Sequence, residues 1–283
     1  MQESSFKDSL VLSPAGDAVG DESFLTVEQA IANLRGSDLG LRYYAAWWLG
    51  RFRVTTPEAI DVLIDSLGDE SDRTTEGGYP LRRNAARALG KLGATRAVPA
   101  LIQCLECDDF YVREAAVQSL GMLGDRSCVP VLMSFLASGL ESAQAESGGI
   151  RLPHPYNAIL ETLGALGAPE AIPLIEPFLN HPFEILQYAA ARSMYELTQD
   201  PTYADYLVQA LSGEKLTLRR AALADLGAIG YLPAAEAIAH TLAENSLKLI
   251  ALKGLLEKQV QRTTPPSLSE GAIQVMTLMD ELL

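Results

Sequence analysis

The sequence predicts an all-α solenoid of about seven stacked helix pairs, and two observations carry this prediction. A ten-residue motif recurs along the 283-residue chain, and a second segment with helical periodicity accompanies each clear copy. A helix pair of this kind cannot bury its apolar face alone, whereas a stack of such pairs buries one continuous core. The fold class therefore follows from the repetition rather than from any single segment.

The motif is clearest in the segments LRYYAAWWLG, LRRNAARALG, VREAAVQSLG and LRRAALADLG. Its apolar residues recur at intervals of three, four, seven and eight, which is typical of an amphipathic helix. Two insertions lengthen a period that is otherwise about 30 residues, within the range of helical repeats. The four clear copies and three weaker ones begin at Leu41, Leu81, Val112, Pro155, Leu186, Leu218 and Leu247.

The accompanying segments begin near a proline, as in Ala97–Leu105 and Cys128–Leu136. Proline suits the first turn of a helix, where its missing N–H leaves no hydrogen bond unmade. Glycines such as Gly93 and Gly124 stand where the preceding helix has to end. The sequence thus predicts a HEAT-like α-solenoid over residues 24–258.

The two ends of the chain and two insertions differ from the repeats. Residues 1–23 are polar and lack a helical period, so we expect a flexible N-terminal arm. Residues 259–283 are expected to form a linker, broken by two prolines, and a short detached helix from Ile273 onwards. The insertions Gly68–Pro80 and Ser138–Pro155 are rich in glycine, serine and charge, which favours loops. Such loops on a solenoid are either binding elements or ordinary surface insertions.

The charge balance excludes several classes of function. The chain has 36 acidic and 22 basic residues, a formal net charge of −14, which argues against general nucleic-acid binding and against adhesion to anionic membranes. No apolar run approaches the roughly 18–20 residues that span a bilayer, so we expect no membrane insertion. Three cysteines do not make a disulfide framework, and we expect a cytoplasmic location.

The sequence contains few groups suited to catalysis or metal binding. Cys104 and Cys107 form a lone CxxC within a helical repeat, without a histidine at ligand spacing. We interpret both cysteines as structural and expect no metal site. His154 lies in the second insertion and is the one histidine that we retain as a candidate acid or base.

The third and seventh residues of each copy lie one turn apart on one helix face, which we expect to line the concave surface. Arginine forks pair with carboxylates, and flat rings bind a planar ligand or a partner's apolar anchor. The stripe therefore indicates either a planar, carboxylate-bearing ligand or a protein-binding groove. The second residue of a copy, as in Arg42 or Arg219, is expected to be structural. The stripe includes Tyr43, Trp47, Arg83, Arg87, Glu114, Tyr188 and Arg192.

Four stretches resemble the E (alpha) subunits of the cyanobacterial E/F-type phycocyanobilin lyases, a group of HEAT-like repeat phycobilin lyases. The resemblance extends over roughly residues 24–258. It is carried by Asp38–Arg53, Gly77–Arg87, Gly230–His240 and Ala243–Glu257.

This resemblance implies a heterodimer with an F-type subunit that attaches phycocyanobilin, through a thioether, to a cysteine of the phycocyanin alpha chain. It further implies a cyanobacterial cytosol, near the phycobilisomes. Two alternatives remain open: a subunit of the related phycoerythrocyanin lyase-isomerase, and a non-catalytic adaptor or chaperone that presents the apo-phycobiliprotein.

The resemblance also implies which side chains would act. The nucleophilic thiol belongs to the acceptor, and phycocyanobilin is a substrate, so no permanently bound cofactor is expected. Arginines would pair with the bilin propionates, and aromatic rings would cover the macrocycle. An acidic group would accept hydrogen bonds from the pyrrole N–H groups or transfer protons. The bilin-binding candidates are Tyr43, Trp47, Arg83, Arg87, Tyr188 and Arg192. The acidic or proton-bearing candidates are Asp72, Tyr79, Glu114 and His154.

A terminal repeat of a solenoid exposes apolar surface that has to be covered. The segment Leu247–Leu256 and the repeat that contains Tyr43 are two candidates for such a surface. We therefore expect the isolated chain to self-associate and an F-type partner to suppress this association.

Overall fold

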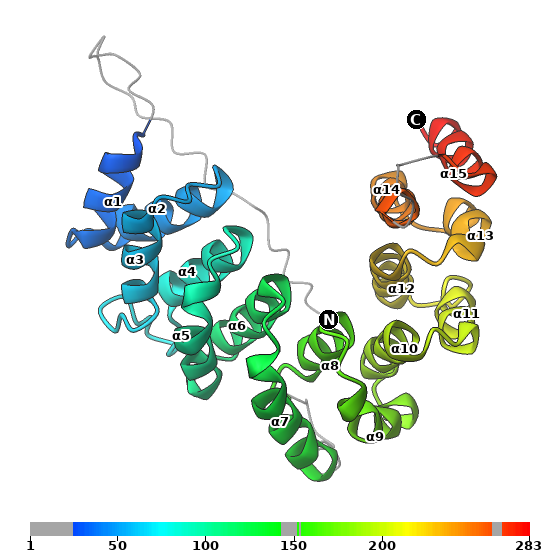
Figure 1. Cartoon of the computed structure of the whole chain (residues 1–283), viewed down its shortest axis with the longest axis horizontal. Coiled ribbons are helices and arrows are strands. Elements are labelled where there is room, and N and C mark those ends of the chain that lie inside the picture. Colours follow the sequence, from blue (N-terminus) through cyan, green and yellow to red (C-terminus); the bar gives the residue numbers. More distant parts are fainter. Residues whose placement is uncertain (1–24, 143–151, 153, 262–267) are drawn as a thin grey trace, which may run out of the picture.

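The computed structural model describes residues 25–142, 152, 154–261 and 268–283. The expected N-terminal arm and much of the second insertion lie outside these residues. Within the described ranges every regular element is a helix, and the helices follow one another along an arc (Figure 1).

Seven helix pairs form the arc, which confirms the predicted HEAT-like solenoid. The first helix of each pair lies on the convex side, and the second lines the concave side (Figure 1). The pairs are α1 (Val27–Arg35) with α2 (Leu39–Arg51), α3 (Pro57–Ser66) with α4 (Pro80–Lys91), α5 (Val98–Gln103) with α6 (Phe110–Leu123), α7 (Val129–Ser142) with α8 (Tyr156–Ala165), α9 (Ile172–Ile175) with α10 (Glu184–Thr198), α11 (Pro201–Ala210) with α12 (Leu216–Ile229), and α13 (Ala235–His240) with α14 (Asn245–Gln261).

Short 3₁₀ turns extend several outer helices, and the predicted helix boundaries recur in the structure. Gly93 and Gly124 have φ values of 65° and 70°, the left-handed conformation that ends a helix. Prolines stand in the first turn of α3, α4, α5 and α11. The 3₁₀ turns are η1 (Thr95–Ala97), η2 (Cys104–Glu106), η3 (Arg126–Cys128), η4 (Pro169–Ala171), η5 (Glu176–Asn180) and η6 (Leu232–Ala234).

Neighbouring inner helices approach closely where the glycine that ends one motif copy meets the eighth residue of the next copy. A Cβ placed on Gly90 would lie 2.6 Å from Ser119 Oγ, and one on Gly121 would lie 3.0 Å from Thr162 Oγ1. The Ser119 hydroxyl also donates to the Ala86 carbonyl at 2.8 Å, across the same contact. The glycine and the small residue of the motif are therefore both required for this spacing.

Arginines at the second residue of the motif bind backbone carbonyls of their own or the following helix pair. Arg42 donates from Nε to the Leu34 carbonyl at 3.0 Å and pairs through Nη2 with Asp69 at 2.5 Å. Arg219 donates from Nη1 to the Gly213 carbonyl of its own pair at 2.6 Å and from Nε to the Leu242 carbonyl of the following pair at 2.9 Å. These bonds satisfy carbonyls at helix ends and in loops, which confirms the structural interpretation of this position.

The apolar core divides into two clusters that meet on α10. The first cluster uses one face of α10, including Leu186 and Met194, and the second uses the other, including Ala191 and Tyr195. Tyr195 stands where most copies have their final glycine, and its ring packs edge-on against that of Tyr231, 5.4 Å between centroids. The close glycine contact is thus replaced by a wider aromatic one between α10 and the turn that follows α12.

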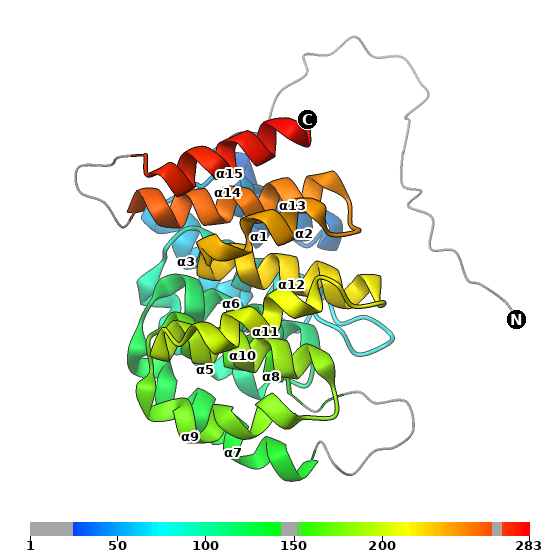
Figure 2. The same cartoon turned by 90° about the vertical axis from the view of Figure 1, so that its right-hand side faces the viewer.

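The C-terminal helix α15 (Glu270–Glu281) differs from the expected detached helix. It packs against α13 and α14, and both views place it alongside α14 (Figures 1 and 2). Ala272, Val275 and Leu278 recur at every third position and are buried, so this helix has an apolar stripe that requires a partner surface. α14 continues to Gln261, three residues beyond the expected end of the solenoid at 258.

The close helix contact gives a first prediction. Gly90→Ala should lower the free energy of unfolding by about 2 kcal/mol, because the new methyl group would overlap Ser119. Gly68→Ala is the matched control, since its Cβ would meet only the Asp65 carbonyl oxygen at 3.8 Å. Urea unfolding followed by circular dichroism measures both. Equal stability of the two variants would contradict the packing argument.

Candidate functional site

A hollow of about 450 Å³ opens where α2 and α4 meet the first insertion. The motif places Tyr43 and Arg83 at the same position of successive inner helices, so their side chains lie on one wall. The insertion adds Asp72 to that wall. The hollow is lined by Leu39, Gly40, Tyr43, Asp72, Pro80 and Arg83.

Asp72 is buried at the first turn of α4. Its Oδ2 accepts the Leu81 N–H at 2.5 Å, whereas its Oδ1 is buried without a hydrogen-bond partner among the described residues. Burial raises the pKa of Asp72, and the nearby Asp69 raises it further, against the opposing effect of the Leu81 N–H. Asp72 therefore retains a proton to higher pH than a solvent-exposed aspartate does.

Arg83 lies between this hollow and a second one of about 320 Å³, which Tyr79 and Tyr111 also line. Its guanidinium carbon is 5.9 Å from the centroid of the Tyr111 ring. Its Nε is buried without a hydrogen-bond acceptor, and the described part of the chain gives it no ion-pair partner. Arg83 is therefore a cation that can still bind an anionic group.

Tyr79 fixes the insertion to the solenoid. Its ring is buried with the Arg82 guanidinium 4.1 Å and the Arg73 guanidinium 5.3 Å from the centroid. Its N–H donates to Asp109 Oδ2 at 2.8 Å. Residues of the insertion, α4 and α6 are thus held together beside Arg83.

Three other candidates lie on the inner helices near this region. Trp47 is 43% exposed and contacts the Tyr44 ring, with 5.5 Å between centroids. Arg87 is exposed and Glu114 is half-buried. None of the three lines the hollow at Tyr43.

His154 and Tyr188 pack among aromatic rings. The His154 ring lies 4.6 Å from that of Phe135, and burial, helped by the charge of Arg113, lowers the pKa of His154. Tyr188 is buried edge-on against Tyr206, 5.8 Å between centroids. Neither candidate lines the hollow at Tyr43.

Arg192 is surrounded by carboxylates from three inner helices. Its Nη1 lies 3.2 Å from Glu161 on α8 and 3.2 Å from Asp225 on α12, and its Nε lies 3.7 Å from Glu196 on α10. We call these four residues the carboxylate cluster. Arg192 is thus already neutralised, unlike Arg83, and it joins α8, α10 and α12.

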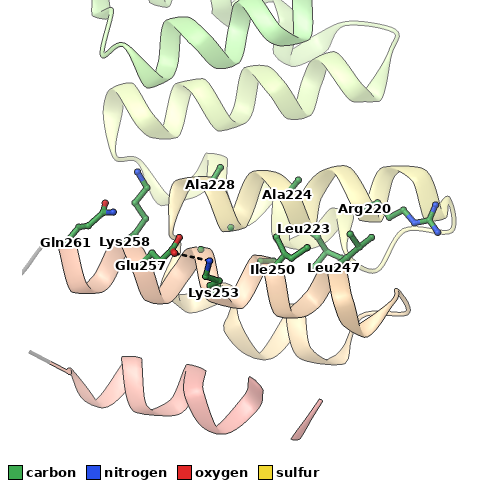
Figure 3. A pocket seen from close by; sticks show the side chains of 13 residues that line it. Arg220, Leu223, Ala224, Ala228, Leu247, Ile250, Lys253, Glu257, Lys258 and Gln261 are labelled. Atoms are coloured by element: carbon green, nitrogen blue, oxygen red, sulfur yellow. Dashed lines mark ion pairs between the residues drawn. The ribbon is translucent and has the colours of Figure 1, made fainter. Parts of the chain in front are cut away.

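A third concavity, a groove of about 440 Å³, lies between α12 and α14 (Figure 3). Ala224, Ala228 and Ile250 are among its apolar lining residues. Two of the cations that line it are already paired: Arg220 with Glu244, and Lys253 with Glu257 at 3.2 Å. This groove is therefore more apolar and less able to attract carboxylates than the region around Arg83.

Two of the three cysteines are buried, and their thiols are weakly acidic. Burial raises the pKa of both Cys104 and Cys128 to about 11, so neither thiol is a ready nucleophile at neutral pH. The described ranges hold no group of histidine, cysteine and acidic residues suited to a metal ion. They also hold no helix both long and apolar enough to cross a bilayer.

Comparison with known proteins identifies the family. A family model described as HEAT repeats matches residues 78–146 and 155–227, and one described as PBS lyase HEAT-like repeat matches residues 41–69. Phycocyanobilin lyase subunit alpha of Microchaete diplosiphon is 66% identical, over 94% of this chain and 92% of the relative. The chain belongs to the phycocyanobilin lyase alpha-subunit family.

A related bilin protein and a solved lyase complex are also similar to this chain. The bilin biosynthesis protein PecE of a Nostoc species is 44% identical over 93% of this chain and 98% of its own length. A solved complex of CpcE and CpcF of phycocyanin lyase from Nostoc contains a chain 60% identical to this one. That match has a TM-score of 0.83 and covers 96% of this chain and 100% of the other. The alpha-subunit resemblance seen in the sequence is confirmed.

The structure brings three of the other sequence candidates next to Arg83. They are Tyr43, Asp72 and Tyr79. Sequence reasoning missed Tyr111, which faces Arg83 but precedes the motif by one residue. It also missed Asp225 as a partner of Arg192. The available signal was a charged residue at the eighth motif position, where other copies mostly have small residues.

The carboxylate cluster gives a prediction on pH. Burial, aided by Asp225, Glu196 and Glu114 and opposed by Arg192, raises the pKa of Glu161 to about 7, above the 4.5 of an exposed glutamate. Between these pH values the native state holds a proton that the unfolded state has lost, so stability falls as pH rises. The loss is complete above about pH 7.

Glu161→Gln should therefore raise the melting temperature more at pH 8 than at pH 5, because glutamine never acquires the charge. Differential scanning fluorimetry across this range tests the expectation. Glu176→Gln on η5 is the control, because Glu176 is exposed and is not among the ion-pair partners of Arg192. A variant less stable than the parent protein at pH 8 would contradict the assignment of the excess charge to Glu161.

Proposed function

We propose that this chain is the alpha subunit of a heterodimeric lyase that attaches phycocyanobilin to a cysteine of the phycocyanin alpha chain through a thioether. Family membership supports the activity, and the solved CpcE–CpcF complex of a relative supports an F-type partner. The observation that carries the site is Arg83, an unneutralised cation beside a buried carboxyl and exposed rings. We further propose a cytoplasmic location.

The bilin would lie on the concave wall at α2 and α4. Arg83, together with the exposed Arg87, would pair with the propionates, because guanidinium–carboxylate pairs are strong and directional. Tyr43 and Trp47, at 40% and 43% exposure, present ring faces that would cover the macrocycle. Arg192 would have a structural role here, since three carboxylates already neutralise it.

Asp72 would be the proton-bearing group. In the proposed addition, the acceptor's sulfur bonds to one carbon of the exocyclic double bond, and a proton is delivered to the other carbon. The thiol supplies that proton overall, so the atoms balance without an oxidant or reductant. Because burial raises the pKa of Asp72, this carboxyl can donate the proton and recover it from the thiol. The unpartnered Oδ1 of Asp72 is the atom assigned to this transfer.

Binding tests the proposed site. Arg83→Ala should raise the Kd of the heterodimer for phycocyanobilin roughly 10- to 100-fold, the effect of losing a charged hydrogen bond. Titration followed by bilin absorbance measures this change. Arg96→Ala is the control, because Arg96 lies on the outer turn η1 and pairs with Asp61. If Arg220→Ala weakened binding while Arg83→Ala did not, the bilin would lie in the α12–α14 groove instead.

Activity tests the proposed proton transfer. Asp72→Asn should lower the rate of attachment roughly 100-fold with little change in bilin affinity. The parent rate should decline as pH rises through the raised pKa of Asp72, and this limb should vanish in the variant. The assay reconstitutes this chain, an F-type subunit, apo-phycocyanin alpha chain and phycocyanobilin, and reads bilin fluorescence after denaturation in acid urea.

Asp61→Asn on the outer helix α3 is the control for that assay. Equal product in the absence of this chain would exclude the lyase function and favour the adaptor or chaperone. Preferential attachment to phycoerythrocyanin, with isomerisation of the bilin, would favour the lyase-isomerase instead.

A further inference from the structure

Cys104 and Cys107 are separated by a single 3₁₀ turn, η2, which follows α5. Both thiols are free, and the Cys107 N–H donates to the Cys104 carbonyl at 3.2 Å across the turn. Side chains three residues apart in such a turn are eclipsed, and the Cα atoms that it joins lie less than about 7 Å apart. Because a disulfide requires about 4.4–6.8 Å between Cα atoms, the turn brings the two thiols within bonding reach.

The fold uses the backbone of Cys107 rather than its thiol. Its carbonyl accepts a hydrogen bond from Arg113, the second residue of the motif copy on α6. The carbonyls of His181 and Gly213 have the same role in later copies, where each accepts the second motif residue at 2.6 Å. An imidazole and a hydrogen atom stand there in place of the thiol, so the repeat architecture does not account for the thiol of Cys107.

The two thiols open on one hollow and differ in exposure. The hollow has a volume of about 550 Å³ and lies between the ends of α3 and α5 and the start of the first insertion. Cys107 is half-buried, and its Sγ lies 3.8 Å from Arg82 Nη1. A partly exposed thiol beside a guanidinium is the environment typical of reactive cysteines. Cys104 is buried, which raises its pKa to about 11, so its thiol would react second.

Arg82 connects this reactive environment to the first insertion. Its Nε donates to the Asp69 carbonyl at 2.5 Å and its Nη2 to the Gly68 carbonyl at 3.3 Å. The same guanidinium covers the ring of Tyr79, 4.1 Å from the centroid. Arg82 thus holds both ends of the insertion. Asp72 lies between these two attachments, so the hold of Arg82 also positions the carboxyl that we assign to proton transfer.

We propose that Cys104 and Cys107 form a reversible disulfide that loosens the first insertion and thereby slows bilin attachment. The effect on attachment rests on the proposed function, whereas the disulfide itself does not. The bond draws the Cys107 sulfur to about 2.05 Å from that of Cys104, and Arg82 then loses its contact with the thiol. In a reducing cytosol, disulfides of this kind are usually transient and redox-sensing.

The reaction is thiol–disulfide exchange with a small disulfide such as oxidised glutathione. The Cys107 thiolate attacks one sulfur of that disulfide, releases one glutathione and leaves a mixed disulfide. Cys104 then gives up its proton, and its sulfur attacks the Cys107 sulfur and releases the second glutathione. One protein dithiol and one glutathione disulfide thus become one protein disulfide and two glutathione thiols, and a dithiol reductant reverses the reaction.

Thiol counting on the isolated full-length chain tests the disulfide without bilin or partner. Oxidised glutathione should lower the number of alkylatable thiols in the denatured chain from three to one, and dithiothreitol should restore them. Cys128→Ala should still lose two thiols, whereas Cys107→Ser should lose none. Peptide mass spectrometry should locate the bond between Cys104 and Cys107. Three free thiols, a bond that includes Cys128, or a stable glutathione adduct at Cys107 would each overturn the proposal.

Proteolysis tests the effect on the insertion. Trypsin should cut after Arg73, which is exposed within the insertion. The oxidised chain should be cut there roughly 10-fold faster, because cleavage follows the open population and one polar contact of a charged group is worth about this factor. Cys107→Ser is the matched control, since its hydroxyl takes the place of the thiol and cannot form a disulfide. Equal rates for the oxidised and reduced parent chain would overturn the proposal.

The attachment rate separates failure of this switch from failure of the proposed function. The chain is oxidised and freed of glutathione before the acceptor is added, because the acceptor's cysteine reacts with the same reagent. Oxidation should slow attachment by the parent heterodimer roughly 10-fold and leave the Cys107→Ser heterodimer unchanged. A reduced heterodimer that attaches no bilin would exclude the proposed function, while thiol counting and proteolysis still decide on the disulfide. An active heterodimer whose rate does not respond to oxidation would overturn the switch alone.

Discussion

The close approach of neighbouring inner helices is the constraint on which the rest of the structure depends. Where Gly90 meets Ser119 and Gly121 meets Thr162, a single added methyl group would have no room. This spacing aligns the third and seventh residues of successive repeats into one wall, so residues more than 30 positions apart share a surface. Tyr43, Asp72 and Arg83 line one hollow because α2 and α4 are held this close.

Local periodicity was sufficient to predict the seven helix pairs and the anchoring role of Arg42 and Arg219, because each repeat carries that information within itself. Whether a charged side chain forms an ion pair depends on residues of neighbouring repeats. Arg83 and Arg192, the third and seventh residues of their copies, both lie on the predicted stripe, yet only Arg192 meets carboxylates from α8 and α12. Sequence reading could not separate the two arginines, since their partners lie in other copies or in an insertion.

The same limit explains the other differences between prediction and structure. α15 was expected to be detached because the prolines before it interrupt the helix, but its buried residues, such as Val275, pack on helices that end before this break. Tyr79 remains a predicted proton-transfer candidate, and the structure adds that its ring lies among arginine side chains and fixes the insertion. The sequence identifies such side chains as candidates. Whether a side chain has a structural or a chemical role depends on what it packs against in the folded protein.

The division of the apolar core at α10 has a mechanical consequence. At α10 the glycine that ends most motif copies is replaced by Tyr195, whose ring packs on that of Tyr231 beside the carboxylate cluster. Rings and ion pairs can separate slightly without the steric overlap that a close glycine contact would meet, so we expect the arc to bend more readily there. A small rotation about α10 moves each end of the arc by a distance that grows with the length of the arm between α10 and that end. The width of the concave side therefore depends on the packing at this helix.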